Sequence, residues 1–131
     1  MPRDYAALHR YLTERSLMPF AWGANANDCI SHGAGAVQVQ NGRALLQGLN
    51  WTSAVGAGRI IAREGGLDAM ISARLRPIAP AHAHRGDIGA VPGDHYLGGL
   101  AIVVVDGALL VGPGGMRLAR RAMTLAWSID P

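Results

Sequence analysis

The sequence contains no lysine, one cysteine and few aromatic residues, and each scarcity limits what the protein can do. All 12 basic residues are arginines, scattered along the 131 residues, and the net charge is only +3. Aromatic residues make up 5% of the chain. Nucleic-acid binding usually needs a clustered basic patch with aromatic side chains on which bases stack, so no nucleic-acid partner is expected. The single cysteine, Cys29, excludes an internal disulfide and fits assembly in a reducing compartment.

Long hydrophobic runs are also missing. The longest, Leu100 to Val105, is far shorter than the roughly 20 apolar residues of a membrane-spanning helix, so no membrane insertion is expected. The start of the chain, with Arg3 and Asp4, has no apolar core of signal-peptide length. Half of the residues are nevertheless hydrophobic, and this length suffices for one core. We therefore expect a single domain over residues 1–131.

The first half of the chain has the periodicity of helices. Asp4 and Asp28 are placed to cap the first two helices, and Asn41-Gly42 is placed to end the second. The apolar spacing predicts four helices, over residues 4–18, 28–40, 52–64 and 67–74.

The second half has the pattern of strands. Residues 85–91 form a turn entering a short strand, and Leu100 to Val105 is a β-branched run typical of a strand buried on both faces. Asp106-Gly107 predicts a hairpin with a return strand over 108–111. A helical turn over 118–124 and a terminal segment at 126–129 complete the chain. Helices followed by an antiparallel sheet indicate an α+β fold, with the N-terminal helices packed on a small C-terminal β-meander.

Cys29 is the main candidate for chemistry. It follows Asp28 at a predicted helix start, where the peptide dipoles lower a thiol pKa and favour the nucleophilic thiolate. A nucleophilic cysteine needs a general base. The candidates are His95, in the loop before the longest strand, and, more weakly, His32, one helical turn after Cys29. The structural alternative is a thiol that packs as a small apolar residue, beside histidines with packing or turn roles.

Asp28 has two interpretations as well. It either fixes the helix start and so aims the thiol, or it caps the helix without any chemical role. Its carboxylate also opposes formation of a neighbouring thiolate.

A metal site is a further hypothesis. His82 and His84 alternate, so on a strand both imidazoles would point the same way, with Asp87 close by. No further ligand completes the set nearby, so no metal and no cofactor are expected. Three tryptophans are expected to anchor the core or an interface: Trp22, Trp51 and Trp127.

Several motifs, in this order, resemble a known family. The chain carries Phe20-x-Trp22-Gly23 before Asp28-Cys29, then Arg85-Gly86-Asp87-Ile88, then Leu100 to Gly107 and the terminal Ala126-Trp127-Ser128-Ile129. This order is similar to that of the NlpC-type, papain-like cell-wall cysteine peptidases. More closely, it resembles a phage-associated family of unknown function that shares their fold.

The resemblance implies a fold, a location and two alternative functions. In the peptidases a histidine opens the strand that precedes the Asp-Gly turn, and the matching position here is Gly99. The first hypothesis is therefore a non-catalytic tail-tip or virion component that docks onto other phage tail proteins, assembled in the bacterial host cytoplasm. The alternative is a cysteine endopeptidase that cleaves peptidoglycan cross-links during genome entry, with Cys29 attacking the amide carbonyl and His95 or His32 moving the proton.

Overall fold

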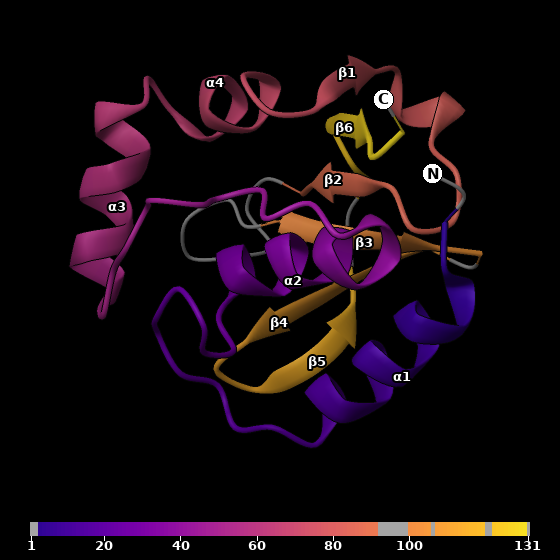
Figure 1. The fold of residues 1–131 in the computed structure, drawn as a ribbon, viewed down its shortest axis with the longest axis horizontal. Coiled ribbons are helices and arrows are strands. Elements are labelled where there is room, and N and C mark those ends of the chain that lie inside the picture. Colours follow the sequence, from indigo (N-terminus) through magenta and orange to yellow (C-terminus); the bar gives the residue numbers. More distant parts are fainter. Residues whose placement is uncertain (1–2, 92–99, 106, 120–121, 131) are drawn as a thin grey trace.

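The computed structural model describes residues 3–91, 100–105, 107–119 and 122–130 (Figure 1). Its described helices lie in the first part of the chain: α1 (Tyr5–Ser16), α2 (Cys29–Asn41), α3 (Ala54–Arg63), α4 (Leu67–Ser72) and the short 3-10 helix η1 (Pro80–His82). The described strands are β1 (Arg76–Ile78), β2 (Ile88–Ala90), β3 (Leu100–Val104), β4 (Gly107–Gly112), β5 (Gly115–Leu118) and β6 (Leu125–Ser128). The predicted α+β class is confirmed.

The strands form one sheet in the order β1-β6-β2-β3-β4-β5, with every neighbouring pair antiparallel. The run β2-β3-β4 is the predicted meander, and β5, which was not predicted, extends it by one strand. The last strand, β6, returns to the other side of β2, so that Ile88 pairs with Ile102 on one side and with Trp127 on the other. The C-terminal segment is therefore an inner strand of the sheet.

Helix α2 lies across β3 and β4, with α1 beside it (Figure 1). Small residues allow this close approach, because a Cβ atom built on Gly33 would lie 2.9 Å from the Leu100 side chain. Ile30 and Val37 of α2 are buried in the main core. The start of α2, which holds Cys29, is therefore fixed against the sheet.

Two predictions from local pattern were wrong. No helical turn forms over 118–124 among the described residues: Leu118 ends strand β5 and pairs with Leu109, and Met123 and Thr124 are irregular. The histidine pair does not lie on a strand either. His82 ends the 3-10 helix η1 and His84 lies in the following loop, so the alternation that would align the two imidazoles is absent.

Candidate functional site

The start of α2 is built around the carboxylate of Asp28, which is completely buried. Its Oδ1 accepts hydrogen bonds from the backbone N–H groups of Ile30 and Ser31, at 2.9 and 2.8 Å. Its Oδ2 accepts from the N–H of Gly23 and from the indole Nε1 of Trp51, both at 2.8 Å. Asp28 thus caps the helix as predicted, and it also ties the preceding loop and Trp51 to the helix start.

The same carboxylate binds the backbone N–H groups that would assist a nucleophile at the start of the helix. In acyl transfer, backbone N–H groups stabilise the developing oxyanion. Here the N–H groups of Ile30 and Ser31 already donate to Asp28, and the Ser31 hydroxyl accepts from the Asp28 N–H at 3.0 Å. These two donors are committed to the cap in this structure.

Cys29 is the first residue of α2, as expected, but its environment is the opposite of an activating one. The residue is fully buried within the main core. Burial raises the pKa of its thiol well above the ordinary value, and the neighbouring Asp28 charge raises it further. The prediction of a lowered pKa is therefore wrong, because loss of solvent outweighs the favourable end of the helix. At neutral pH the thiol stays protonated.

His32 is also fully buried, between α1 and the sheet. Its ring stacks on Tyr11, with the centroids 6.0 Å apart, and neither ring nitrogen reaches normal hydrogen-bond geometry with a residue in the described part of the chain. Burial lowers its pKa to about 4, an effect that the backbone of Leu109 opposes in part. Since no hydrogen bond joins the imidazole to Cys29, the two residues do not form a nucleophile–base pair here.

The other predicted base, His95, lies outside the described residues, so its role stays a prediction. For the metal hypothesis, no cluster of three His, Cys, Asp or Glu side chains forms within the described ranges. The Asp87 carboxylate instead bonds to Arg3 and to backbone N–H groups of His84 and Ile129.

Of the tryptophans, Trp51 and Trp127 are buried core residues, and each indole N–H is satisfied. Trp127 donates to the Ser72 hydroxyl at 3.0 Å and so joins β6 to α4. Trp22 is half-buried and packs edge-to-face on Phe20, with the ring centroids 5.3 Å apart.

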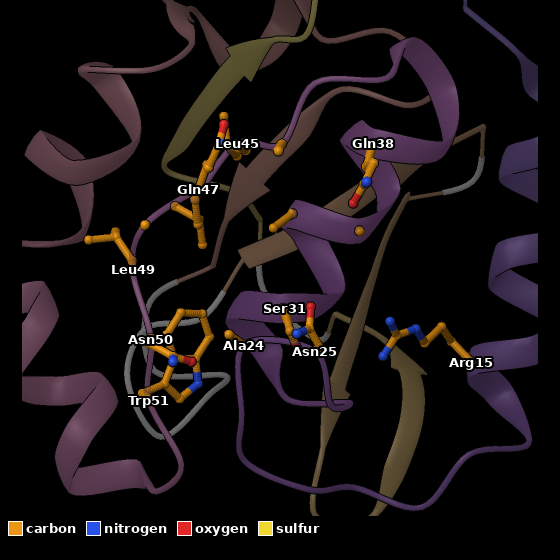
Figure 2. A pocket seen from close by; sticks show the side chains of 15 residues that line it. Arg15, Ala24, Asn25, Ser31, Gln38, Leu45, Gln47, Leu49, Asn50 and Trp51 are labelled. Carbon is orange, nitrogen blue, oxygen red and sulfur yellow. The ribbon is translucent and has the colours of Figure 1, made fainter.

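The structure also contains a pocket that sequence reasoning missed (Figure 2). It has a volume of about 310 Å³ and lies between α2, the end of α1 and the loop 44–51. Neither Cys29 nor His32 is among the described residues that line it. Its polar side chains come from three separate segments, so no single motif could have indicated it.

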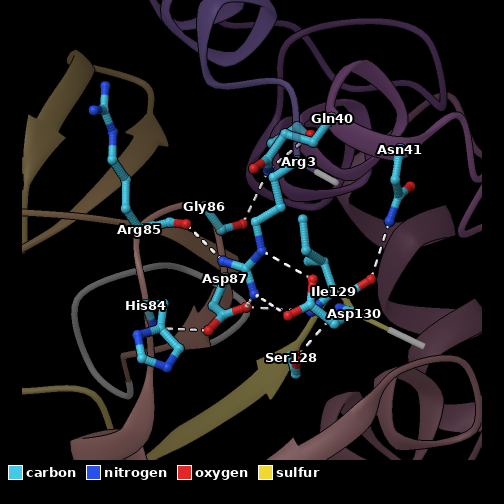
Figure 3. Close-up of polar contacts among 11 residues, drawn as sticks. Arg3, Gln40, Asn41, His84, Arg85, Gly86, Asp87, Ser128, Ile129 and Asp130 are labelled. Carbon is cyan, nitrogen blue, oxygen red and sulfur yellow. Dashed lines mark hydrogen bonds and ion pairs between the residues drawn. The ribbon is translucent and has the colours of Figure 1, made fainter. Parts of the chain in front are cut away.

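A second missed feature joins the two ends of the chain (Figure 3). The Arg3 guanidinium bonds to the buried Asp87 at 2.6 Å and to the exposed Asp130 at 3.1 Å. It also donates to the backbone carbonyl of Arg85 at 2.6 Å. The sequence indicated Asp87 as a candidate metal ligand, but its contacts explain the Arg-Gly-Asp segment as part of the framework.

The fold and the site together define an α+β chain with a sealed cysteine at the start of its central helix. A family model described as "Domain of unknown function (DUF6950)" matches residues 2–129, and the chain belongs to that family. No curated protein and no solved structure matches the chain. No helix among the described residues is long and apolar enough to cross a membrane.

Proposed function

We propose that the protein is a non-catalytic component of a phage tail, with an NlpC-type, papain-like fold that keeps the cysteine position without its chemistry. It works in the virion after assembly in the host cytoplasm, and its partners are other tail proteins. The observation that carries the proposal is the state of Cys29. Its thiol is fully buried and protonated, and it has no imidazole partner among the described residues.

A group of apolar side chains in the segment between α1 and α2 fits a docking role. Leu17 and Met18, just after α1, are 82% and 41% exposed, and they lead into the half-buried Phe20 and Trp22. Exposed side chains of this size, close together in the chain, are typical of protein–protein interfaces, where aromatic residues and methionine are enriched. We expect this segment, residues 17–22, to contact the partner.

The docking test compares two exposed apolar positions. The chain is co-expressed with candidate tail proteins, and complexes are separated by size-exclusion chromatography. Leu17→Glu should abolish the complex, whereas Val55→Glu, at an exposed position of α3, should leave it intact. Equal retention by both variants contradicts a docking role for residues 17–22.

The catalytic test distinguishes the proposal from the endopeptidase alternative. Purified protein and its Cys29→Ala variant are incubated with peptidoglycan, and released peptides are measured by mass spectrometry. We expect no release by either protein, with circular dichroism showing that both are folded. Release that depends on Cys29 would overturn the proposal and establish the peptidase.

A further inference from the structure

The pocket beside α2 has a polar lining in which one side chain is charged. Its floor is one face of α2, which includes Ala34 and Gly35, and its far wall is the loop 44–51. Arg15 reaches in from α1 at one end, and Asn50 and Trp51 lie at the other (Figure 2). A volume of about 310 Å³ is at the lower end of the range for small-molecule sites. The pocket is therefore suited to a small, polar ligand.

Arg15 determines the charge of that ligand. Its Nη1 donates to the Ala26 carbonyl and, at 3.3 Å, to Asn27 Oδ1, and its guanidinium lies 5.0 Å from the centre of the Tyr11 ring. The Nε and Nη2 groups form no hydrogen bond within the described ranges. Figure 2 shows the guanidinium end directed towards Asn25 and Ser31. Two N–H groups of a guanidinium form the planar fork that matches a carboxylate.

The remaining polar groups are neutral and complement peptide groups. Asn25, Gln38 and Asn50 are exposed side-chain amides on the lining, and none of them makes a side-chain hydrogen bond to another described residue. A primary amide offers both donors and an acceptor, which is what the N–H and C=O of a peptide bond require. No acidic side chain is among the described residues of the lining, so a bound carboxylate meets no like charge there.

We propose that this pocket binds a short peptide by its free C-terminal carboxylate, with Arg15 holding the carboxylate and the amides of Asn25, Gln38 and Asn50 pairing with the last peptide groups. A neutral saccharide would leave the guanidinium fork unmatched, and a phosphate dianion would face one cation only. The inference is independent of the proposed tail function, because it uses neither Cys29 nor residues 17–22.

The test uses two small probes that differ only at their C-terminus. N-acetyl-glycyl-glycine and its C-terminal amide are titrated into ¹⁵N-labelled protein, and amide shifts are followed by NMR. The carboxylate probe should cause saturable shifts at residues 31–38 and 44–51 and should bind at least about tenfold more tightly than the amide. A neutral disaccharide serves as a third probe and should cause none.

Variants assign the effect to named side chains. Arg15→Gln should remove the preference for the carboxylate, whereas Arg59→Gln, an exposed arginine on α3, should preserve it. Because Arg15 also contacts the loop before α2, Gln38→Ala provides a second variant on the helix surface. It should weaken both probes and leave their ratio unchanged.

Three outcomes would overturn the inference. They are equal binding of the acid and the amide, the absence of saturable shifts in the pocket, and binding of the disaccharide in preference to either peptide. Retention of the carboxylate preference in a folded Arg15→Gln variant would also contradict it.

Discussion

Burial holds three titratable side chains around the start of α2, those of Tyr11, Cys29 and His32, in their uncharged forms. It raises the pKa of Tyr11 to about 12 and that of the Cys29 thiol still further, and it lowers the pKa of His32 to about 4. In each case desolvation is the largest cause. An acid–base pair would need one of these groups to ionise near neutral pH. Cys29 and His32, which the sequence marked as candidates for chemistry, are therefore packed in the core as uncharged groups.

The buried imidazole of His32 predicts an acid-sensitive fold. Its pKa is about 4 in the folded chain against about 6.5 when exposed, so the unfolded state binds more protons between these values. Stability should fall as pH drops from about 6.5 towards 4, by about 3 kcal/mol from this residue. Urea unfolding across that window should show a much smaller loss in His32→Phe.

His9 provides the control for that experiment, because it lies exposed on α1. His9→Gln should keep the pH dependence of the parent chain. If His32→Phe and His9→Gln lose stability equally on acidification, the buried imidazole is not the cause.

At the scale of helices and strands, local signals were sufficient for the helices and insufficient for the edges of the sheet. Caps are encoded nearby, so Asp28 and Gly42 located the ends of α2 to within one residue. Strand β1 was missed because a distant partner creates it. Strand β5 was missed although it pairs with the adjacent β4 across the turn at 113–114, because the local pattern predicted a helical turn from Leu118 on. Strand β1 is three residues long, contains Pro77 and exists by pairing with β6, about 50 residues later in the chain.

The turn before β2 requires glycine at position 86. Gly86 has a φ of +92°, and a Cβ atom there would overlap Oε1 of the buried Gln40. The Gln40 amide donates to the Gly86 carbonyl at 2.9 Å, which holds α2 against this turn. Gly86→Ala should therefore destabilise the chain by about 2–4 kcal/mol, through backbone strain and steric overlap together.

The matched control is Gly42, which also has a positive φ, of +80°, but has open space around its Cβ position. Gly42→Ala should cost only the strain, about 1 kcal/mol, in the same chemical denaturation experiment. Equal losses of unfolding free energy in Gly86→Ala and Gly42→Ala would show that the contact with Gln40 is unimportant.

At the scale of the whole molecule, the two ends of the chain are held together beside the start of β2 and the end of β6. Arg3 contacts Asp87, next to β2, and Asp130, just after β6 (Figure 3). Arg3 and Asp87 lie 84 positions apart, so no local pattern could have paired them. The pocket was unpredictable for the same reason, because α1, α2 and a loop each supply part of its lining.

Breaking this contact should weaken the whole fold. Arg3→Gln leaves the Asp87 carboxylate buried with only its two backbone N–H donors, from His84 and Ile129. Removing one partner of a buried ion pair is strongly destabilising, and we expect a loss of about 2–3 kcal/mol by urea unfolding. Arg10→Gln, at an exposed position of α1, should stay within about 0.5 kcal/mol of the parent. Similar stability of the two variants contradicts a structural role for Arg3.

The central claim, that Cys29 is a sealed and protonated thiol, is tested most directly by its rate of alkylation. Because the chain has one cysteine, iodoacetamide labelling followed by mass spectrometry reports on Cys29 alone. In the folded protein at pH 7–8, labelling should be at least about 100-fold slower than in urea, because it requires opening of the core. Rapid labelling of the folded protein, persisting below pH 7 as for an activated thiolate, would contradict the account and restore Cys29 as a nucleophile.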